Sequence, residues 1–236
     1  MPICRLCEND AELRNSHIVP EFLYSPLYNS KHQLMGIHGR GSLGWQFLQK
    51  GIREPLFCES CEQHFNEHFE KPFRARWVER APLPDPWPGN DVITVNVDYN
   101  NFKLFHLSVL FRAGVSSLPT FAAVTLGSHE QKLRRLLLDR NAGESWQYPV
   151  FAYAVIHHKT NRVIQIVTRP QQSKFGGRRC YGMMYGGAEW WVCVASDRNI
   201  DFEQMALRPD GSMSFTAVPW NEVGAIQDAS AALSNA

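Results

Sequence analysis

The sequence lacks a surplus of charge of either sign. Its 24 lysines and arginines nearly balance 23 aspartates and glutamates, which leaves a formal net charge of +1 at pH 7. Non-specific binding to nucleic acid depends mainly on lysines and arginines that neutralise phosphates. The balance therefore argues against a protein that coats nucleic acid through bulk electrostatics, and any phosphate contact must come from local clusters.

Long apolar runs are also missing. No stretch approaches the length of a bilayer span, and residues 1–5 lack the apolar core of a secretory signal. We therefore expect a soluble, cytoplasmic protein with no membrane partner. Hydrophobic residues make up 44% and charged residues 20% of the 236 residues, which is typical of folded domains with one large core or two modest ones.

Cysteine is scarce, but four of the six cysteines occur as two identical pairs. Cys4-x-x-Cys7 and Cys58-x-x-Cys61 have the spacing of zinc knuckles. Two such pairs offer four thiolates, which complete the tetrahedral coordination of a structural Zn²⁺ and leave no position for water. The sequence therefore predicts one structural zinc site.

The remaining two cysteines have no such spacing. Cys180 and Cys193 lie in apolar, strand-like runs. Without a secretory signal, reduced thiols are favoured over disulfides. We therefore expect two buried free cysteines with no functional role.

A proline-rich segment divides the chain. Residues 81–91 carry four prolines at alternate positions, which fix an extended connection and exclude a helix or a central strand. The predicted organisation is a small zinc domain at residues 1–80, a linker at 81–91, and a larger domain at 92–236.

The pattern of apolar residues predicts the α+β class, with a mainly antiparallel sheet in the larger domain. In the first domain, residues 59–70 read as a helix, because Phe65 and Phe69 are one turn apart, and Pro72 marks its end. Beyond the linker, periodicity and turn signals predict helices at 101–114 and 128–140 and strands at 91–99, 151–157, 162–168, 180–185 and 190–195.

The residues between the two cysteine pairs are more specific than the pairs themselves. The segment His17-Ile18-Val19-Pro20 lies between them, and the second pair is followed by a polar helix. Over about residues 4–72 this order resembles the cysteine-bearing HNH endonucleases, in which a treble-clef zinc module supports a ββα-metal site. The resemblance implies the same architecture for the first domain.

The resemblance also implies a catalytic role for His17. In that family the histidine of the first strand acts as general base on water, and a divalent cation stabilises the phosphoryl oxygens and the leaving group. Imidazole accepts a proton near neutral pH, and a cation neutralises charge that develops on a phosphate. The expected function is a nuclease that hydrolyses phosphodiester bonds in DNA with Mg²⁺ or Mn²⁺, while the zinc is structural.

Two of the departures from the family pattern concern the expected catalytic metal. Ser16 stands where an aspartate or histidine usually precedes the base, and Glu62 stands where a histidine commonly follows the second pair. Glu62 can bind Mg²⁺ or Mn²⁺ through oxygen and is the first expected ligand of the catalytic metal. His64 and His68, four residues apart on one helix face, are the next candidates. Asn66 is expected to position the phosphate or the scissile bond.

Other interpretations remain open. His17 could simply form a hydrogen bond within the zinc module. Ser16, together with Arg53 and Glu54 where the family often has asparagine, favours a treble clef that binds nucleic acid without cleaving it. The near-zero net charge and the large second domain favour a module that binds a protein partner instead.

Two groups of side chains also allow two interpretations each. A basic cluster after the second cysteine pair, with aromatic residues interleaved, could contact phosphates or form a solvated helix face. Aromatic residues in the later strands could stack on bases or pack in the core. The basic cluster comprises Lys71, Arg74, Arg76 and Arg80 with Phe73 and Trp77, and the aromatic group comprises Tyr181, Tyr185, Trp190 and Trp191.

Overall fold

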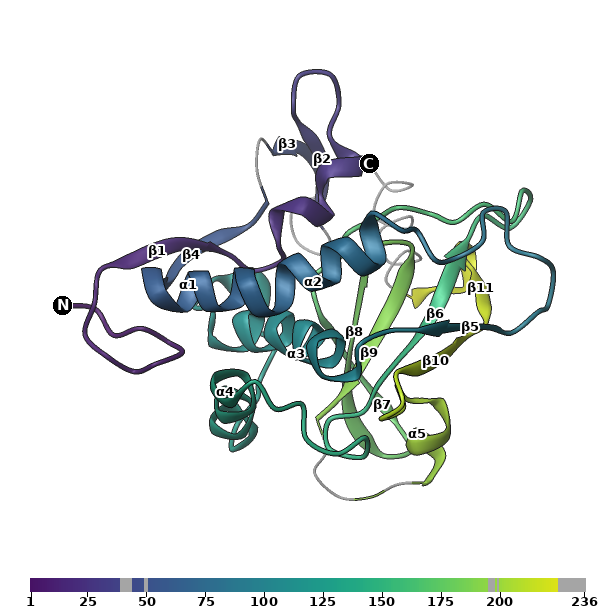
Figure 1. Cartoon of the computed structure of the whole chain (residues 1–236). Helices are drawn as coiled ribbons and strands as arrows, with labels where there is room; N and C mark the ends of the chain where they lie inside the picture. Colours follow the sequence, from purple (N-terminus) through teal and green to yellow (C-terminus); the bar gives the residue numbers. More distant parts are fainter. Residues whose placement is uncertain (39–43, 49–50, 195–197, 199, 225–236) are drawn as a thin grey trace.

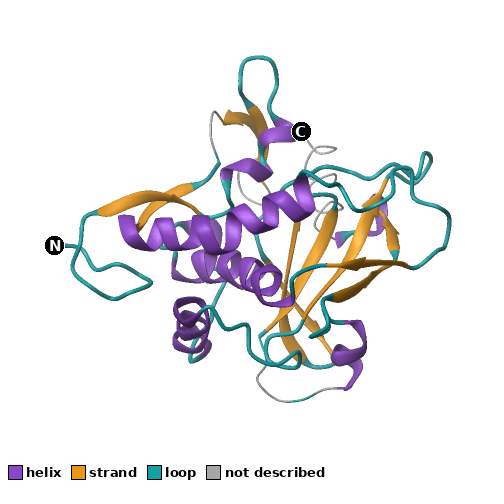
Figure 2. Ribbon diagram, in the orientation of Figure 1, coloured by secondary structure: helices purple, strands orange, loops and turns teal. Residues whose placement is uncertain are grey.

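The structure is a computed structural model that describes residues 1–38, 44–48, 51–194, 198 and 200–224. The longer helices gather on one side of the molecule, and a five-stranded sheet with the short α5 beside it forms the other side (Figure 2). Most strand pairs are antiparallel. This mixed architecture belongs to the α+β class that the sequence predicts.

The N-terminal part is built on two antiparallel strands. β1 (Leu13–His17) pairs with β4 (Arg53–Cys58), and His17 lies opposite Arg53. This pairing brings the loop before β1 next to the end of β4. Between them lie two single helical turns, Glu21–Leu23 and Ser25–Leu27, and a hairpin of β2 (Leu34–His38) and β3 (Gly44–Leu48).

One long helix follows β4 (Figure 1). The sequence predicts that it ends at Pro72, and this is wrong because the helix continues to Val78. Proline has no amide hydrogen for the helical ladder, and wider π-helical turns on either side of α2 accommodate the interruption. The helix consists of α1 (Glu59–Phe65), a π-helical turn (Asn66–Glu70), α2 (Lys71–Phe73) and a second π-helical turn (Arg74–Val78).

The part of the chain that follows the proline-rich segment contains the main sheet. Its elements are β5 (Ile93–Asn96), α3 (Tyr99–Val115), a single turn (Pro119–Phe121), α4 (His129–Asp139), β6 (Val150–Ile156), β7 (Gln171–Phe175), β8 (Arg178–Tyr185), β9 (Ala188–Cys193), α5 (Ile200–Met205), β10 (Ser212–Phe215), β11 (Ala217–Pro219) and a last turn (Trp220–Glu222). The sheet has the strand order β11-β6-β9-β8-β7, and β5 pairs separately with β10. The strand predicted at 162–168 forms only one bridge, between Val163 and Ile156.

The helix α3 occupies the centre of the molecule. It begins where the Asp98 carboxylate accepts a hydrogen bond from the Asn101 amide at 2.7 Å, a typical N-terminal cap. Most of its residues are buried, because α3 packs against both the long helix and β9. A helix that is covered on several sides needs no polar face, which explains its largely apolar sequence.

The hydrophobic core continues across the predicted domain boundary. Phe73 of the long helix stacks on Phe105 of α3 with ring centroids 3.8 Å apart. Trp77 packs edge-on against Trp190 of β9 at 4.9 Å, and its indole N–H donates to the Gly186 carbonyl at 2.8 Å. The first 80 residues therefore share their core with the rest of the chain.

The proline-rich segment has no helix or strand, as its prolines predict. It nevertheless lies against the protein, because Trp87 is buried and its main-chain amide donates to the Asn161 carbonyl at 2.8 Å. Among the aromatic residues of the later strands, Tyr181, Tyr185 and Trp190 are fully buried. The structure therefore places these three in the core, whereas Trp191 is partly exposed.

Cys180 of β8 and Cys193 of β9 form a disulfide, so the expectation of two free thiols is wrong. The β8–β9 register sets the two residues directly opposite each other, and both are buried. Within the described residues, no helix has both the length and the apolar composition needed to cross a membrane.

Candidate metal centre and the adjacent cleft

The four cysteines of the two pairs converge on one point. Cys4 and Cys7 lie on the loop before β1, Cys58 ends β4, and Cys61 lies in the first turn of α1. Their Sγ atoms all lie within 4.8 Å of one another. Four sulfur ligands this close together can hold a metal ion. No other group of three or more such ligands gathers in the part of the chain that the structure describes.

The spacing suits tetrahedral coordination by thiolates. A Zn–S bond is about 2.3 Å long, so two sulfurs on a tetrahedral Zn²⁺ lie about 3.8 Å apart. Cys7 Sγ and Cys58 Sγ are 3.8 Å apart. The Cys58 amide donates to Cys4 Sγ at 3.4 Å, and Ser60 Oγ lies 3.2 Å from Cys58 Sγ. Outer contacts of this kind orient metal ligands.

Hydrogen bonds favour the thiolate form of Cys58. Burial raises its pKa, but hydrogen bonds from the Ser60 hydroxyl and the Cys61 amide outweigh burial and lower the pKa to about 6. A thiolate is the form in which cysteine binds a metal.

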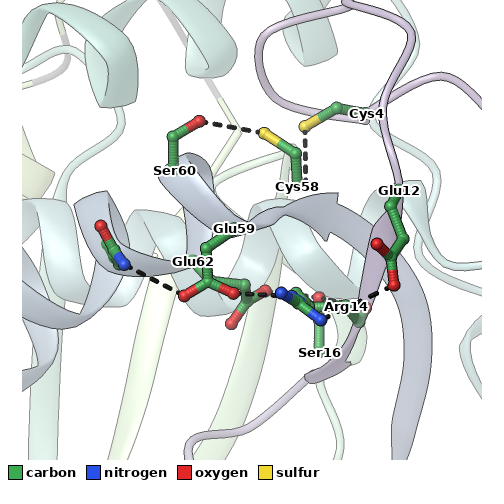
Figure 3. A network of polar contacts seen from close by, with 9 residues as sticks. Cys4, Glu12, Arg14, Ser16, Cys58, Glu59, Ser60 and Glu62 are labelled. Atoms are coloured by element: carbon green, nitrogen blue, oxygen red, sulfur yellow. Dashed lines mark hydrogen bonds and ion pairs between the residues drawn. The ribbon is translucent and has the colours of Figure 1, made fainter.

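Polar contacts fasten β1 to α1 beside the four cysteines (Figure 3). Arg14 Nε donates to Glu59 Oε2 at 2.6 Å. Two residues further along β1, the Ser16 hydroxyl donates to the Glu62 carboxylate. The next residue is His17, so these contacts place the proposed base beside the long helix.

A cleft of about 590 Å³ opens where β1 meets the long helix. Its lining contains two residues that the sequence analysis assigned to catalysis, His17 and Glu62. It also contains other polar side chains, among them Glu21, Tyr28, Glu70 and Arg112.

His17 is held by a neighbouring carboxylate. Glu21 Oε2 contacts His17 Nε2, and the Tyr28 hydroxyl donates to Glu21 Oε1 at 2.5 Å. Burial lowers the pKa of His17 below its ordinary value of 6.5, Glu21 opposes this shift, and Arg53 reinforces it. The imidazole is therefore neutral near pH 7, with one nitrogen engaged by Glu21.

Two further carboxylates project from the long helix into the cleft. Glu62 accepts from Ser16, and burial raises the pKa of Glu62 while Arg112 and the Ser16 hydrogen bond oppose the rise. Glu70 lies two turns later and also lines the cleft. Carboxylate oxygens are the ligands that Mg²⁺ and Mn²⁺ prefer.

Arg112 reaches the same cleft from α3. Its Nη2 donates to Glu70 Oε1 at 2.5 Å, and its Nη1 donates to the His17 carbonyl at 3.2 Å. The guanidinium lies over the Phe65 ring, 4.5 Å from the centroid. A residue from beyond the proline-rich segment thus forms part of the cleft wall.

The structure does not bring the other predicted site residues to the cleft. His64 is hydrogen-bonded through Nε2 to the Leu137 carbonyl of α4 at 2.8 Å, and His68 Nδ1 lies 3.4 Å from Arg140 Nη1. Both imidazoles therefore face α4. Asn66 is exposed and lies outside the cleft lining.

The basic cluster is largely engaged within the protein. Arg74 lines the cleft and pairs with Glu79 at 3.2 Å, and Arg76 donates to a main-chain carbonyl of β5. The interleaved Phe73 and Trp77 are buried in the core. Only Arg74 of this group therefore stands at the cleft.

Glu54, which stands where the family often has asparagine, has a structural role. Its carboxylate accepts hydrogen bonds from the Ser116 hydroxyl at 2.5 Å and the Ser117 amide at 3.0 Å. These bonds tie the end of α3 to β4. Glu54 does not line the cleft.

Several cleft residues were not predicted from the sequence, among them Glu21, Tyr28, Glu70 and Arg112. Glu21 contacts His17 although the two residues share no helix, because His17 ends β1 and Glu21 begins the next helical turn, so their spacing carried no local signal. Arg112 is 95 residues from His17 and has no local signal. Comparisons with protein-family models, curated proteins and solved structures found no match for this chain.

Proposed function

We propose that this protein is a metal-dependent nuclease of the HNH type, which hydrolyses phosphodiester bonds in DNA. The observation that carries the proposal is the placement of His17. A neutral, carboxylate-held imidazole lies at the end of β1, in a cleft whose lining also contains the Glu62 carboxylate and two arginines.

The N-terminal part has the chain order of a treble clef, and we assign it that role. A cysteine loop is followed by an antiparallel strand pair and then by a helix that carries the last cysteine in its first turn. The metal is zinc in this proposal, because four thiolates at tetrahedral spacing form a closed structural set. Its function is to hold β1 against α1 and thereby to place His17.

His17 acts as the general base. With Glu21 at Nε2, the N–H of the neutral ring is held there, and Nδ1 is the nitrogen that accepts a proton from water. Glu21 also stabilises the imidazolium that forms, while Tyr28 holds Glu21. Glu21 is thus the third group that orients the base, as in other sites where a base activates a nucleophile.

The catalytic cation is Mg²⁺ or Mn²⁺ in this proposal. Glu62 and Glu70 offer it oxygen ligands in the cleft, and Mg²⁺ in phosphoryl sites is commonly held by one or two carboxylates together with substrate phosphate. When bound, it would neutralise charge on the phosphate and the leaving oxygen. His64 and His68 take no part in this proposal, because both face α4.

The charge of the cleft supports a metal requirement. Four glutamates and two arginines line it: Glu21, Glu62, Glu70 and Glu79, with Arg74 and Arg112. A phosphodiester that enters an acid-rich cleft is repelled unless a cation offsets the charge. For the same reason, a protein that binds nucleic acid at this cleft without a cation fits the structure less well.

The first experiment is a cleavage assay with purified wild type, His17→Ala and His64→Ala. The substrates are plasmid DNA, single-stranded DNA and RNA, each with Mg²⁺, with Mn²⁺ and with EDTA. We expect metal-dependent cleavage of DNA by the wild type and about a 10²- to 10⁴-fold loss in His17→Ala, because a general base is removed. Zinc content should be the same in all three proteins.

His64→Ala is the matched control, because it removes an imidazole of the N-terminal part of the chain that lies outside the cleft. It should cleave like the wild type. Normal cleavage by His17→Ala would exclude His17 as the base. Salt-sensitive binding of DNA without any cleavage would instead support the non-catalytic alternative.

A further inference from the structure

Arg112 differs from the other charged residues of the cleft because it comes from α3, which follows the proline-rich segment. Its side chain is only 2% exposed, and its guanidinium covers the Phe65 ring. A charge that is removed from water to this extent is costly unless it is paired and hydrogen-bonded. The hydrogen-bond partners of Arg112 therefore indicate the role of this residue.

Both hydrogen-bond partners belong to the cleft. Nη1 donates to the main-chain carbonyl of His17, and Nη2 donates to the carboxylate of Glu70. The guanidinium is a rigid planar fork, so two bonds from one fork fix the relative positions of their acceptors. The end of β1 is thereby tied to the long helix at the level of Glu70.

One donor of the guanidinium is not satisfied. The buried Nε of Arg112 has no hydrogen-bond partner among the described residues. Unsatisfied buried polar groups are rare and need an explanation. The donors of Arg112 that do form hydrogen bonds are Nη1 and Nη2, and both bond to groups of the cleft.

We propose that Arg112 is a positioning residue of the nuclease. It holds the main chain of His17 at a set distance from the carboxylates of the long helix, so that base and cation ligands act on one phosphate. This inference deepens the proposed function and rests on it. It also gives α3, which follows the proline-rich segment, a part in catalysis.

The experiment compares Arg112→Met and Arg112→Lys with Lys103→Met. Lys103 is a matched control, since it is a cation of the same helix that is 1% exposed and bonds to the Tyr99 hydroxyl and the Glu144 carbonyl, away from the cleft. Values of kcat and KM for metal-dependent DNA cleavage are measured at a temperature at which circular dichroism shows every variant to be folded.

We expect Arg112→Met to lower kcat about 100-fold, because a small displacement of a catalytic group has an effect of this size. KM should stay within about three-fold of wild type, since substrate binding is not removed. Arg112→Lys should recover part of the loss, because it keeps the charge without the fork. Lys103→Met should cleave like the wild type. A fall in kcat no larger in Arg112→Met than in Lys103→Met would refute the positioning role.

A second measurement does not require cleavage. The ring nitrogens and ring protons of His17 are observed by NMR in wild type, Arg112→Met and Lys103→Met. We expect the His17 signals to shift in Arg112→Met and to stay unchanged in Lys103→Met. If the wild type cleaves no nucleic acid, the proposed nuclease fails, and unchanged His17 signals in Arg112→Met would overturn the positioning role separately.

Discussion

At the scale of single residues, the environment of His17 determines what its imidazole can do. The ring is partly buried, which lowers its pKa, and Glu21 alone of its near contacts both raises that pKa and fixes one ring nitrogen. Neutral imidazole is the form that accepts a proton, so the proposed base is active above the pKa of His17 and inactive below it.

Replacement of Glu21 tests this dependence. The Glu21 charge raises the pKa of His17, as does Glu70, whereas burial and Arg53 lower it. In Glu21→Gln the pKa of His17 should therefore fall, and the acid limb of the pH profile of kcat/KM should move to lower pH. Glu79→Gln, also in the cleft lining, is the control and should leave the limb in place. A limb that moves to higher pH would contradict this assignment.

The metal site makes a second prediction at this scale. Cys61→Ser removes one of the four sulfur ligands while the polypeptide and its charge change little. Because metal binding to such sites is coupled to folding, we expect loss of bound zinc and a lower midpoint of thermal unfolding. Metal analysis and circular dichroism measure the two effects. A wild-type protein that stays folded and metal-free after mild chelation would refute the structural role of the metal.

At the scale of elements, the long helix connects the cysteines to the core. Its first turn carries Cys61 and the cleft residue Glu62, its middle carries Glu70, and its last part buries Phe73 and Trp77. Its two π-helical turns allow it to pass Pro72 without ending. The placement of the cleft therefore depends on packing far from the metal site.

The packing of Phe73 can be measured directly. Phe73 is 1% exposed and stacks on Phe105. Phe73→Ala should lower the free energy of unfolding by about 3–5 kcal/mol, which is usual when a buried phenylalanine leaves a cavity. Leu138→Ala on α4, where Leu138 is 40% exposed, should change it by less than about 0.5 kcal/mol. Denaturant unfolding of both variants checks the difference, and equal effects would contradict this packing.

The molecule as a whole has a core that does not divide at the proline-rich segment. Contacts such as Phe73 with Phe105 and Trp77 with Trp190 join the first 80 residues to the rest. Such contacts are lost when the chain is cut at the predicted boundary, and exposed aromatic surface favours association.

We therefore expect that residues 1–80 expressed alone, with zinc, give a poorly dispersed NMR spectrum. The full chain should give a dispersed spectrum under the same conditions. A cooperative, well-folded fragment 1–80 would show instead that the N-terminal part is an independent domain, as the sequence pattern suggests.

Local patterns in the sequence were sufficient for some of these features. The two cysteine pairs predicted the four-cysteine cluster because the spacing within each pair is itself the signal. Apolar runs bounded by turn signals predicted α3 and the strands β6, β8 and β9, because buried elements need apolar side chains and turns need residues such as glycine and asparagine. The prolines of 81–91 predicted a segment without helix or strand.

Tertiary structure alone decided the rest. The disulfide depends on the register of β8 and β9, the role of Arg112 depends on how α3 packs against the long helix, and the orientation of His64 depends on α4. Each of these is a contact between residues that are distant along the chain or set by strand pairing. Their formation follows from how whole elements bury their surfaces together, which no local pattern records.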